Sequence, residues 1–299
     1  EGYKEYSIRE AQETFALLKN EDNALPISKT SKVTLLGLRS YAAIYGNSGG
    51  SIADKNTVDN GNKIYEAFEK SGFQLNPSML NTYKTYFSDK TWGGKGFGAT
   101  PPEYTDFAKT NEVSELSPSE LASINPNYKE DFSSYNDAAI VVVGRPGGES
   151  KEYVAGANPE CTTGNIMGLS EEEREIIKLA KDNFKKVIVL VNSVTTMEIK
   201  ELRDDPDIDA IMWIGYPGAY GFYAVADVLN GTVSPSASLG DVFVSNNQAN
   251  PSMQSFGNIP WANASEFEAA ENVNSYLVEA EGIYQGYRYY ETRYNDIVN

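Results

Sequence analysis

The stretch Ala138–Glu149, AAIVVVGRPGGE, joins an unbroken apolar run to a glycine-rich turn that carries an arginine and a glutamate. Apolar runs of this kind are typical of strands that are buried on both faces of a parallel sheet. Open α/β sheets bind their ligands just beyond the carboxyl ends of such strands. Glu149 therefore lies where an α/β protein usually carries out its chemistry.

Other apolar runs along the chain predict further strands of the same sheet. The longer runs are Lys32–Leu38, Lys186–Val191 and Ala210–Ile214, and Phe73–Leu75 is expected to be a short edge strand. Residues 88–134 show no sustained period, and we expect them to form an irregular insertion, either a functional loop or an excursion over the surface.

Between the predicted strands, apolar residues recur at helical spacing. This spacing predicts helices over Ser7–Lys19, Asn60–Ser71, Met79–Phe87 and Ala219–Leu229. Ser170 and Glu173 form a capping-box pattern that begins another helix. Strands and helices that alternate in this way predict an α/β fold, a three-layer αβα sandwich around a mainly parallel sheet of about six strands.

The composition narrows the classes of function. The chain of 299 residues has 25 basic and 42 acidic side chains, a formal net charge of −17. A phosphate backbone or an anionic membrane surface would be repelled, so we expect no nucleic-acid partner. No apolar segment approaches the ~20 residues that a membrane-spanning helix needs, so none is expected in this chain.

The chain has no histidine and a single cysteine, Cys161. The absence of histidine excludes Ser-His-Asp and Cys-His catalysis and most zinc sites from this chain. Carboxylate, arginine, tyrosine and backbone groups remain as candidates for chemistry, and we expect neither a cofactor nor a metal ion.

Seven motifs occur in an order that resembles one known family. They are KNEDNALPI, YGNSGGS, AAIVVVGRPGGE, KVIVLVNS, DAIMWIGYPGAYG, ADVLNGTVSPSASL and EGIYQGYRYYE, and they extend over nearly the whole chain. Together they resemble the α/β sandwich domain of glycoside hydrolase family 3, whose β-glucosidases hydrolyse terminal β-D-glucosyl residues. The resemblance implies a β-glucoside or oligosaccharide as substrate.

The resemblance also implies that the active site is shared between two domains. In the family, a (β/α)₈ barrel supplies an aspartate nucleophile, and the sandwich domain supplies the general acid/base glutamate. The nucleophile motif is not present here, so we expect residues 1–299 to form a single sandwich domain that is inactive alone, with residues 245–299 leading to another domain. Similarity to members with the sandwich ahead of the barrel favours that domain order.

Glu149 matches the family's Gly-Gly-Glu motif and is the implied acid/base. The next residues depart from the usual Gly-x-Asp and read Ser150, Lys151 and Glu152, so Glu152 is an alternative acid/base. Arg145 has two candidate roles, a substrate contact or a pairing with a carboxylate, the latter as a surface ion pair of little energetic value.

Two further segments are candidates for substrate binding. Ser48, Gly49 and Gly50 match the family's serine- and glycine-rich loop near the aglycone side of the site, although a structural turn is an alternative. Trp92 is a candidate stacking surface for a sugar face, or an anchor for its own loop.

Two other interpretations stay open. The departures at Ser150 and at Ser238, where the family usually has arginine, fit a non-catalytic carbohydrate-binding or scaffold domain. The sheet alone would also fit a nucleotide-binding flavodoxin-like or Rossmann-like protein, but no G-x-G-x-x-G follows the first strand and no P-loop occurs. The cellular location is not encoded in these residues.

Overall fold

A computed structural model describes residues 2–46, 55–88, 115–145, 166–254, 259–260, 262–263, 266, 275–276 and 278–297. Its centre is a six-stranded sheet with the strand order β1-β6-β5-β4-β2-β3. The strands are β1 (Ala16–Asn20), β2 (Lys32–Leu36), β3 (Gln74–Leu75), β4 (Ala138–Arg145), β5 (Val187–Ser193) and β6 (Ala210–Trp213). Only the edge strand β1 pairs antiparallel within this sheet. The predicted mainly parallel sheet is confirmed.

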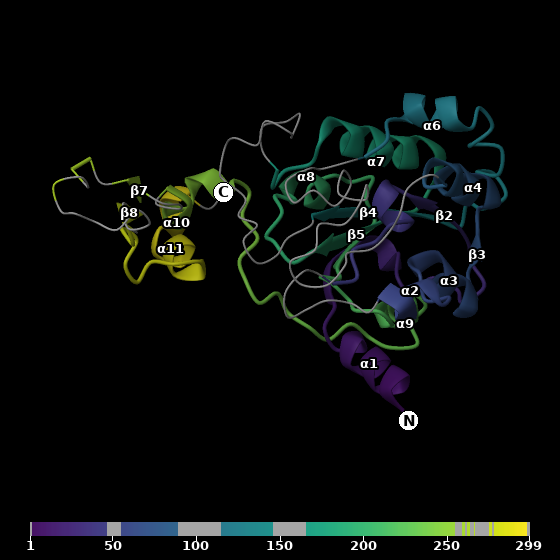
Figure 1. Ribbon diagram of the computed structural model, residues 1–299, viewed down its shortest axis with the longest axis horizontal. Coiled ribbons are helices and arrows are strands. Elements are labelled where there is room, and N and C mark those ends of the chain that lie inside the picture. Colours follow the sequence, from purple (N-terminus) through teal and green to yellow (C-terminus); the bar gives the residue numbers. More distant parts are fainter. Residues whose placement is uncertain are drawn as a thin grey trace.

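Helices cover both faces of the sheet (Figure 1). One face carries α1 (Tyr3–Gln12), α2 (Lys55–Asp59), α3 (Ile64–Lys70) and α9 (Gly221–Leu229), whose apolar residues share one core cluster. The other face carries α4 (Pro77–Tyr86), α6 (Pro118–Ile124), α7 (Glu171–Asn183) and α8 (Lys200–Arg203) around a second cluster. The architecture is the three-layer αβα sandwich expected from the sequence.

Strand β4 lies at the middle of the sheet, between β2 and β5, and all of its residues are buried. Successive side chains of a strand point to opposite faces. Accordingly, Ile140 and Val142 pack in the cluster that includes α9, while Val141 and Val143 pack in the cluster that includes α7. Burial on both faces explains why this strand reads as an unbroken apolar run.

Helix α7 begins as the capping-box pattern predicts. The Ser170 hydroxyl accepts a hydrogen bond from the Glu173 backbone N–H at 3.1 Å, and the Glu173 carboxylate accepts one from the Ser170 backbone N–H at 2.9 Å. Ile176, Ile177 and Ala180 then form the buried stripe that packs on the sheet. Two otherwise unpaired donors at the helix start are thereby satisfied.

The prediction of one helix over Ser7–Lys19 is wrong in its second half. Helix α1 ends at Gln12, and strand β1 follows from Ala16 and pairs with β6. Phe15 is fully buried, and the backbone after it hydrogen-bonds to the sheet edge. Long-range pairing therefore overrides a local period that fits a helix.

The insertion predicted over residues 88–134 contains a regular element, helix α6. Ser117 and Glu120 form a capping box, and Pro118 takes the first helical position, where its missing N–H is not needed. Leu121 is fully buried in the cluster with α7. The capping signal was present in the sequence, but the apolar stripe behind it is too short to show a period.

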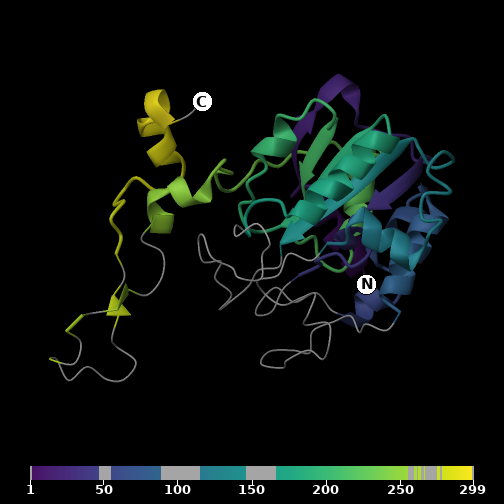
Figure 2. The ribbon, with the colours of Figure 1, turned by 90° about the horizontal axis from the view of Figure 1, so that it is seen from above.

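Beyond residue 250 the described chain lies apart from the sheet in both views (Figures 1 and 2). It contains α10 (Pro251–Gln254), the strand pair β7 (Ile259–Pro260) and β8 (Ser275–Tyr276), α11 (Tyr287–Thr292) and α12 (Tyr294–Ile297). Ile283 and Tyr287 are 72% and 60% exposed. That this segment leads to another domain stays a prediction.

Candidate functional site

Most of the predicted site residues lie outside the described part of the chain. Arg145 is described, whereas Glu149, Glu152, Ser48, Gly49, Gly50 and Trp92 are not. The strands that precede two of these segments, β2 and β4, are neighbours and run parallel. The chain therefore leaves the same edge of the sheet towards Ser48 and towards Glu149, which is the edge where α/β proteins bind ligands.

Arg145 ends β4 and is completely buried on the α7 side of the sheet. Its guanidinium donates two hydrogen bonds to the Glu173 carboxylate, Nη1 to Oε1 at 2.7 Å and Nη2 to Oε2 at 2.8 Å. The remaining donors reach the backbone carbonyls of Gly144, Ile166 and Gly168. All five N–H donors of an arginine are thus used. We call this arrangement the Arg145 anchor.

Of the two roles expected for Arg145, the structure shows the pairing with a carboxylate. The pair is buried, with side-chain exposures of 0% and 4%, so the expectation of a surface ion pair is wrong. Burying both charges removes their hydration, which only good geometry and complete hydrogen bonding can offset. The bidentate contact and the three carbonyls supply that compensation.

Glu173 performs two tasks in the same structure. Its carboxylate caps the start of α7 through the Ser170 N–H and binds Arg145 at the same time. A negative charge in the first turn of a helix is also favoured by the helix dipole. The capping pattern identified Glu173 in the sequence, but its pairing with Arg145 across 28 residues was missed.

A second polar group, Asn192, lies at the same edge on the next strand. Its side chain is completely buried and accepts a hydrogen bond from the Ile44 N–H at 2.7 Å. Its amide group donates to the carbonyls of Ile44 at 2.9 Å and Gly215 at 2.7 Å. This Asn192 anchor ties the chain after β2 to the chain after β6. Both anchors had the same signal in the sequence. In each, a polar residue follows a buried apolar run, at the carboxyl end of the strand.

Glu115 is a partly buried carboxylate at the same edge. It accepts hydrogen bonds from the backbone N–H groups of Leu38, at 2.9 and 3.0 Å, and of Leu116, at 2.8 Å. Burial raises the pKa of this carboxyl to about 8, although the backbone bonds oppose the shift. Gly37 lies against it with φ +90°, and a Cβ there would approach the Val142 carbonyl oxygen to 2.6 Å. The site therefore requires glycine.

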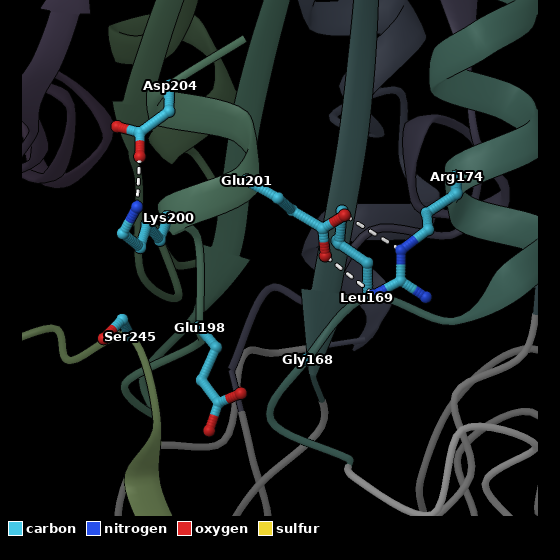
Figure 3. A pocket seen from close by; sticks show the side chains of 8 residues that line it. All are labelled: Gly168, Leu169, Arg174, Glu198, Lys200, Glu201, Asp204 and Ser245. Carbon is cyan, nitrogen blue, oxygen red and sulfur yellow. Dashed lines mark hydrogen bonds and ion pairs between the residues drawn. The ribbon is translucent and has the colours of Figure 1, made fainter.

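A cavity of about 570 Å³ opens between α7, α8 and the chain near Ser245 (Figure 3). Arg174 in its wall forms a bidentate pair with Glu201 at 2.7 and 2.9 Å, and Lys200 pairs with Asp204 at 2.6 Å. A further carboxylate, Glu198, accepts from the Asn247 N–H. The charged side chains of this wall are therefore paired with one another, or in Glu198 hydrogen-bonded to the backbone.

Within the described ranges, no group of three or more acidic, cysteine or histidine side chains is placed to hold a metal ion. The helices in those ranges are also too short or too polar to cross a membrane.

Residues 15–287 match the family described as "Glycosyl hydrolase family 3 C-terminal domain". The chain belongs to this family. The resemblance inferred from the sequence motifs is thereby confirmed.

Relatives of this family 3 domain are named as β-glucosidases. "Beta-glucosidase A" of Butyrivibrio fibrisolvens is 27% identical over 305 residues, and the match covers 96% of this chain and 32% of the relative. "Beta-glucosidase" of Ruminococcus albus is 26% identical over 287 residues, covering 95% of this chain and 26% of the relative. The family 3 domain thus spans a third or less of these relatives' length.

Solved β-glucosidases contain a similar structure. The enzyme from Paenibacillus barengoltzii matches 97% of this chain with a TM-score of 0.72 and 26% identity, over 28% of its own chain. β-Glucosidase 3B from Thermotoga neapolitana in complex with glycerol matches 97% of this chain with a TM-score of 0.67 and 26% identity, over 36% of its own chain. The family 3 domain is a recurrent part of larger proteins.

Proposed function

We propose that this chain is the acid/base-supplying domain of a retaining β-glycosidase that removes terminal β-D-glucosyl residues from β-glucosides or oligosaccharides. Glu149 is the proposed general acid/base, and a (β/α)₈ barrel of the same protein is proposed to supply the aspartate nucleophile. The family and the β-glucosidase names of the relatives support the substrate class. The observation that carries the residue assignment is that Glu149 follows closely after the carboxyl end of the central strand β4.

The chemistry requires two carboxyl groups in different protonation states, about 5–5.5 Å apart. In the first step, protonated Glu149 gives its proton to the glycosidic oxygen while the aspartate attacks the anomeric carbon. In the second step, ionised Glu149 removes a proton from a water molecule, which displaces the aspartate. Two displacements at the same carbon retain its configuration.

The neighbouring segments have supporting roles in this proposal. Ser48, Gly49 and Gly50 follow β2, the strand next to β4, and would border the aglycone. Trp92 would offer an aromatic face to a sugar. Glu152 is the alternative acid/base. Arg145 receives no sugar contact, because its N–H donors already bind protein acceptors.

The test compares Glu149→Gln with Glu152→Gln in the full-length protein. For an alkyl β-glucoside, whose leaving group needs a proton, we expect Glu149→Gln to lower kcat/KM by about 10²–10⁴-fold, the usual contribution of general acid catalysis. For dinitrophenyl β-glucoside, whose leaving group needs little protonation, the loss should be far smaller. Glu152→Gln is expected to change both values little. The reverse pattern would assign the acid/base to Glu152.

The second candidate function is a non-catalytic carbohydrate-binding or scaffold domain. It is favoured by Ser150 and Glu152, which stand where the family usually has glycine and aspartate. This function predicts that neither variant changes hydrolysis of either substrate. Residues 1–299 alone are expected to be inactive under both proposals, so the full-length protein is needed to separate them.

A further inference from the structure

The Arg145 anchor contacts the chain on both sides of residues 146–165. Arg145 immediately precedes residue 146, and Ile166 is the first described residue after residue 165. The guanidinium binds the carbonyls of Ile166 and Gly168, so it holds the chain that leaves β4 against the chain that returns towards α7. The segment between these ends contains Glu149.

The chemistry of the anchor depends on arginine in particular. The planar guanidinium directs donors to a carboxylate on one side and to three carbonyls from separate points of the backbone. A lysine has only three donors on a single atom and cannot reproduce this geometry. Tyr216 adds a further constraint, because its hydroxyl donates to the Arg145 carbonyl at 2.8 Å.

The stability of the fold alone does not explain why this pair is charged. Replacing a buried ion pair by apolar residues of similar volume is often neutral or stabilising. A fully bonded pair does, however, fix the position of the groups that it joins. Glu149 is so close in sequence that its Cα lies within about 14 Å of the Arg145 Cα even in a fully extended chain. A misplacement of about 1 Å at a reacting group can lower a rate by about 10²-fold.

We infer that Arg145 and Glu173 are positioning residues that set where the proposed acid/base carboxyl meets the glycosidic oxygen. The inference rests on the proposed function of Glu149. It assigns to the Arg145 anchor a role in the protonation step.

The test measures kcat/KM of the full-length protein for two substrates, an alkyl β-glucoside and dinitrophenyl β-glucoside. The quantity of interest is the ratio of the first value to the second, because it isolates the need for proton donation. The concentration of folded enzyme cancels in this ratio, so partial unfolding of a variant does not affect it. Arg145→Lys and Glu173→Gln are the two test variants.

Arg174→Lys is the matched control. Arg174 lies next to Glu173 on α7 and forms an equally bidentate pair with Glu201, but this pair is exposed. We expect the ratio to fall about 10- to 100-fold in Arg145→Lys and in Glu173→Gln, and to stay within about twofold in Arg174→Lys. The basic limb of the pH profile of kcat/KM should also move in the two test variants. A purely structural role would lower both substrates' values equally and leave the ratio and the profile unchanged, which would overturn the inference.

Glu149→Gln separates a failure of the positioning role from a failure of the proposed function. If Glu149→Gln lowers the ratio and the two test variants do not, the positioning role fails while the proposed function stands. If Glu149→Gln leaves the ratio unchanged, the proposed function fails and the inference fails with it.

Discussion

The Arg145 and Asn192 anchors both hold chain segments together at the carboxyl edge of the sheet, but with different chemistry. They lie on adjacent strands, where Gly144 pairs with Asn192 in the register of the sheet. Arg145 continues the face of Val141 and Val143, and Asn192 continues the opposite face, that of Ile188 and Leu190. Both side chains are 0% exposed, and both hold loops at the carboxyl edge through backbone groups.

The difference between them is charge. The Asn192 anchor needs three hydrogen bonds and no counter-ion. The Arg145 anchor contains a buried cation, so it needs a carboxylate as its partner. Removing only one of the two charges would leave the other buried and unpaired, which is strongly destabilising. The comparison shows that a neutral side chain can join two loops through hydrogen bonds alone, whereas a buried charged one also needs a counter-charge.

The largest effect is expected for removal of the buried cation. Arg145→Met leaves the Glu173 carboxylate buried without its partner, which should lower the free energy of unfolding by about 3–5 kcal/mol. Urea unfolding of the protein measures this change. Adding Glu173→Gln, which keeps the helix cap, should recover most of the loss. If the double variant is as unstable as Arg145→Met, the uncompensated charge is not the cause.

A smaller effect is expected at the neutral anchor. Asn192→Ala leaves buried N–H and C=O groups of Ile44 and Gly215 without this partner and should lower the free energy of unfolding by about 1–3 kcal/mol. Asn183→Ala is the control, because Asn183 is exposed and its amide bonds only to Leu179 within its helix. If Asn192→Ala lowers the free energy of unfolding as much as Arg145→Met does, the buried charge does not set the two anchors apart.

Glu115 is expected to give the carboxyl edge a pH dependence that the neutral Asn192 anchor lacks. Its pKa of about 8 in the folded protein lies above the ordinary value of 4.5, so the folded state retains a proton that the unfolded state releases. The stability that this group contributes should therefore be fully present below about pH 4.5 and be lost progressively as the pH rises to about 8. Glu115→Gln should flatten this part of the profile, as followed by the Tm. An unchanged slope would show that Glu115 is ionised in the folded protein at neutral pH.

Much of the fold was predictable because its signals are local. The buried strand at Ala138–Arg145 and the capping box at Ser170 and Glu173 appear in the sequence as an apolar run and a short motif. The strand at Ala16–Asn20 was missed because its pairing with β6 comes from a segment nearly two hundred residues away along the chain. A local period carries no information about that pairing.

The candidate site was predictable only in part for the same reason. The sequence placed Arg145 at the strand end and Glu173 in a cap, but it could not show that the two side chains meet. Asn192 and Glu115 were missed as well, because their partners Ile44 and Leu38 are remote in sequence. The burial that gives these groups their chemistry is a property of the assembled sheet edge.

The most direct test of the proposed function is the response of Glu149→Ala to azide. In the full-length protein acting on dinitrophenyl β-glucoside, loss of the base should make hydrolysis of the glycosyl-enzyme slow. Azide needs no deprotonation before it attacks, so it should restore turnover and yield β-glucosyl azide with retained configuration. If azide leaves the rate of Glu149→Ala unchanged and the only product is glucose, Glu149 is not the acid/base of a retaining enzyme.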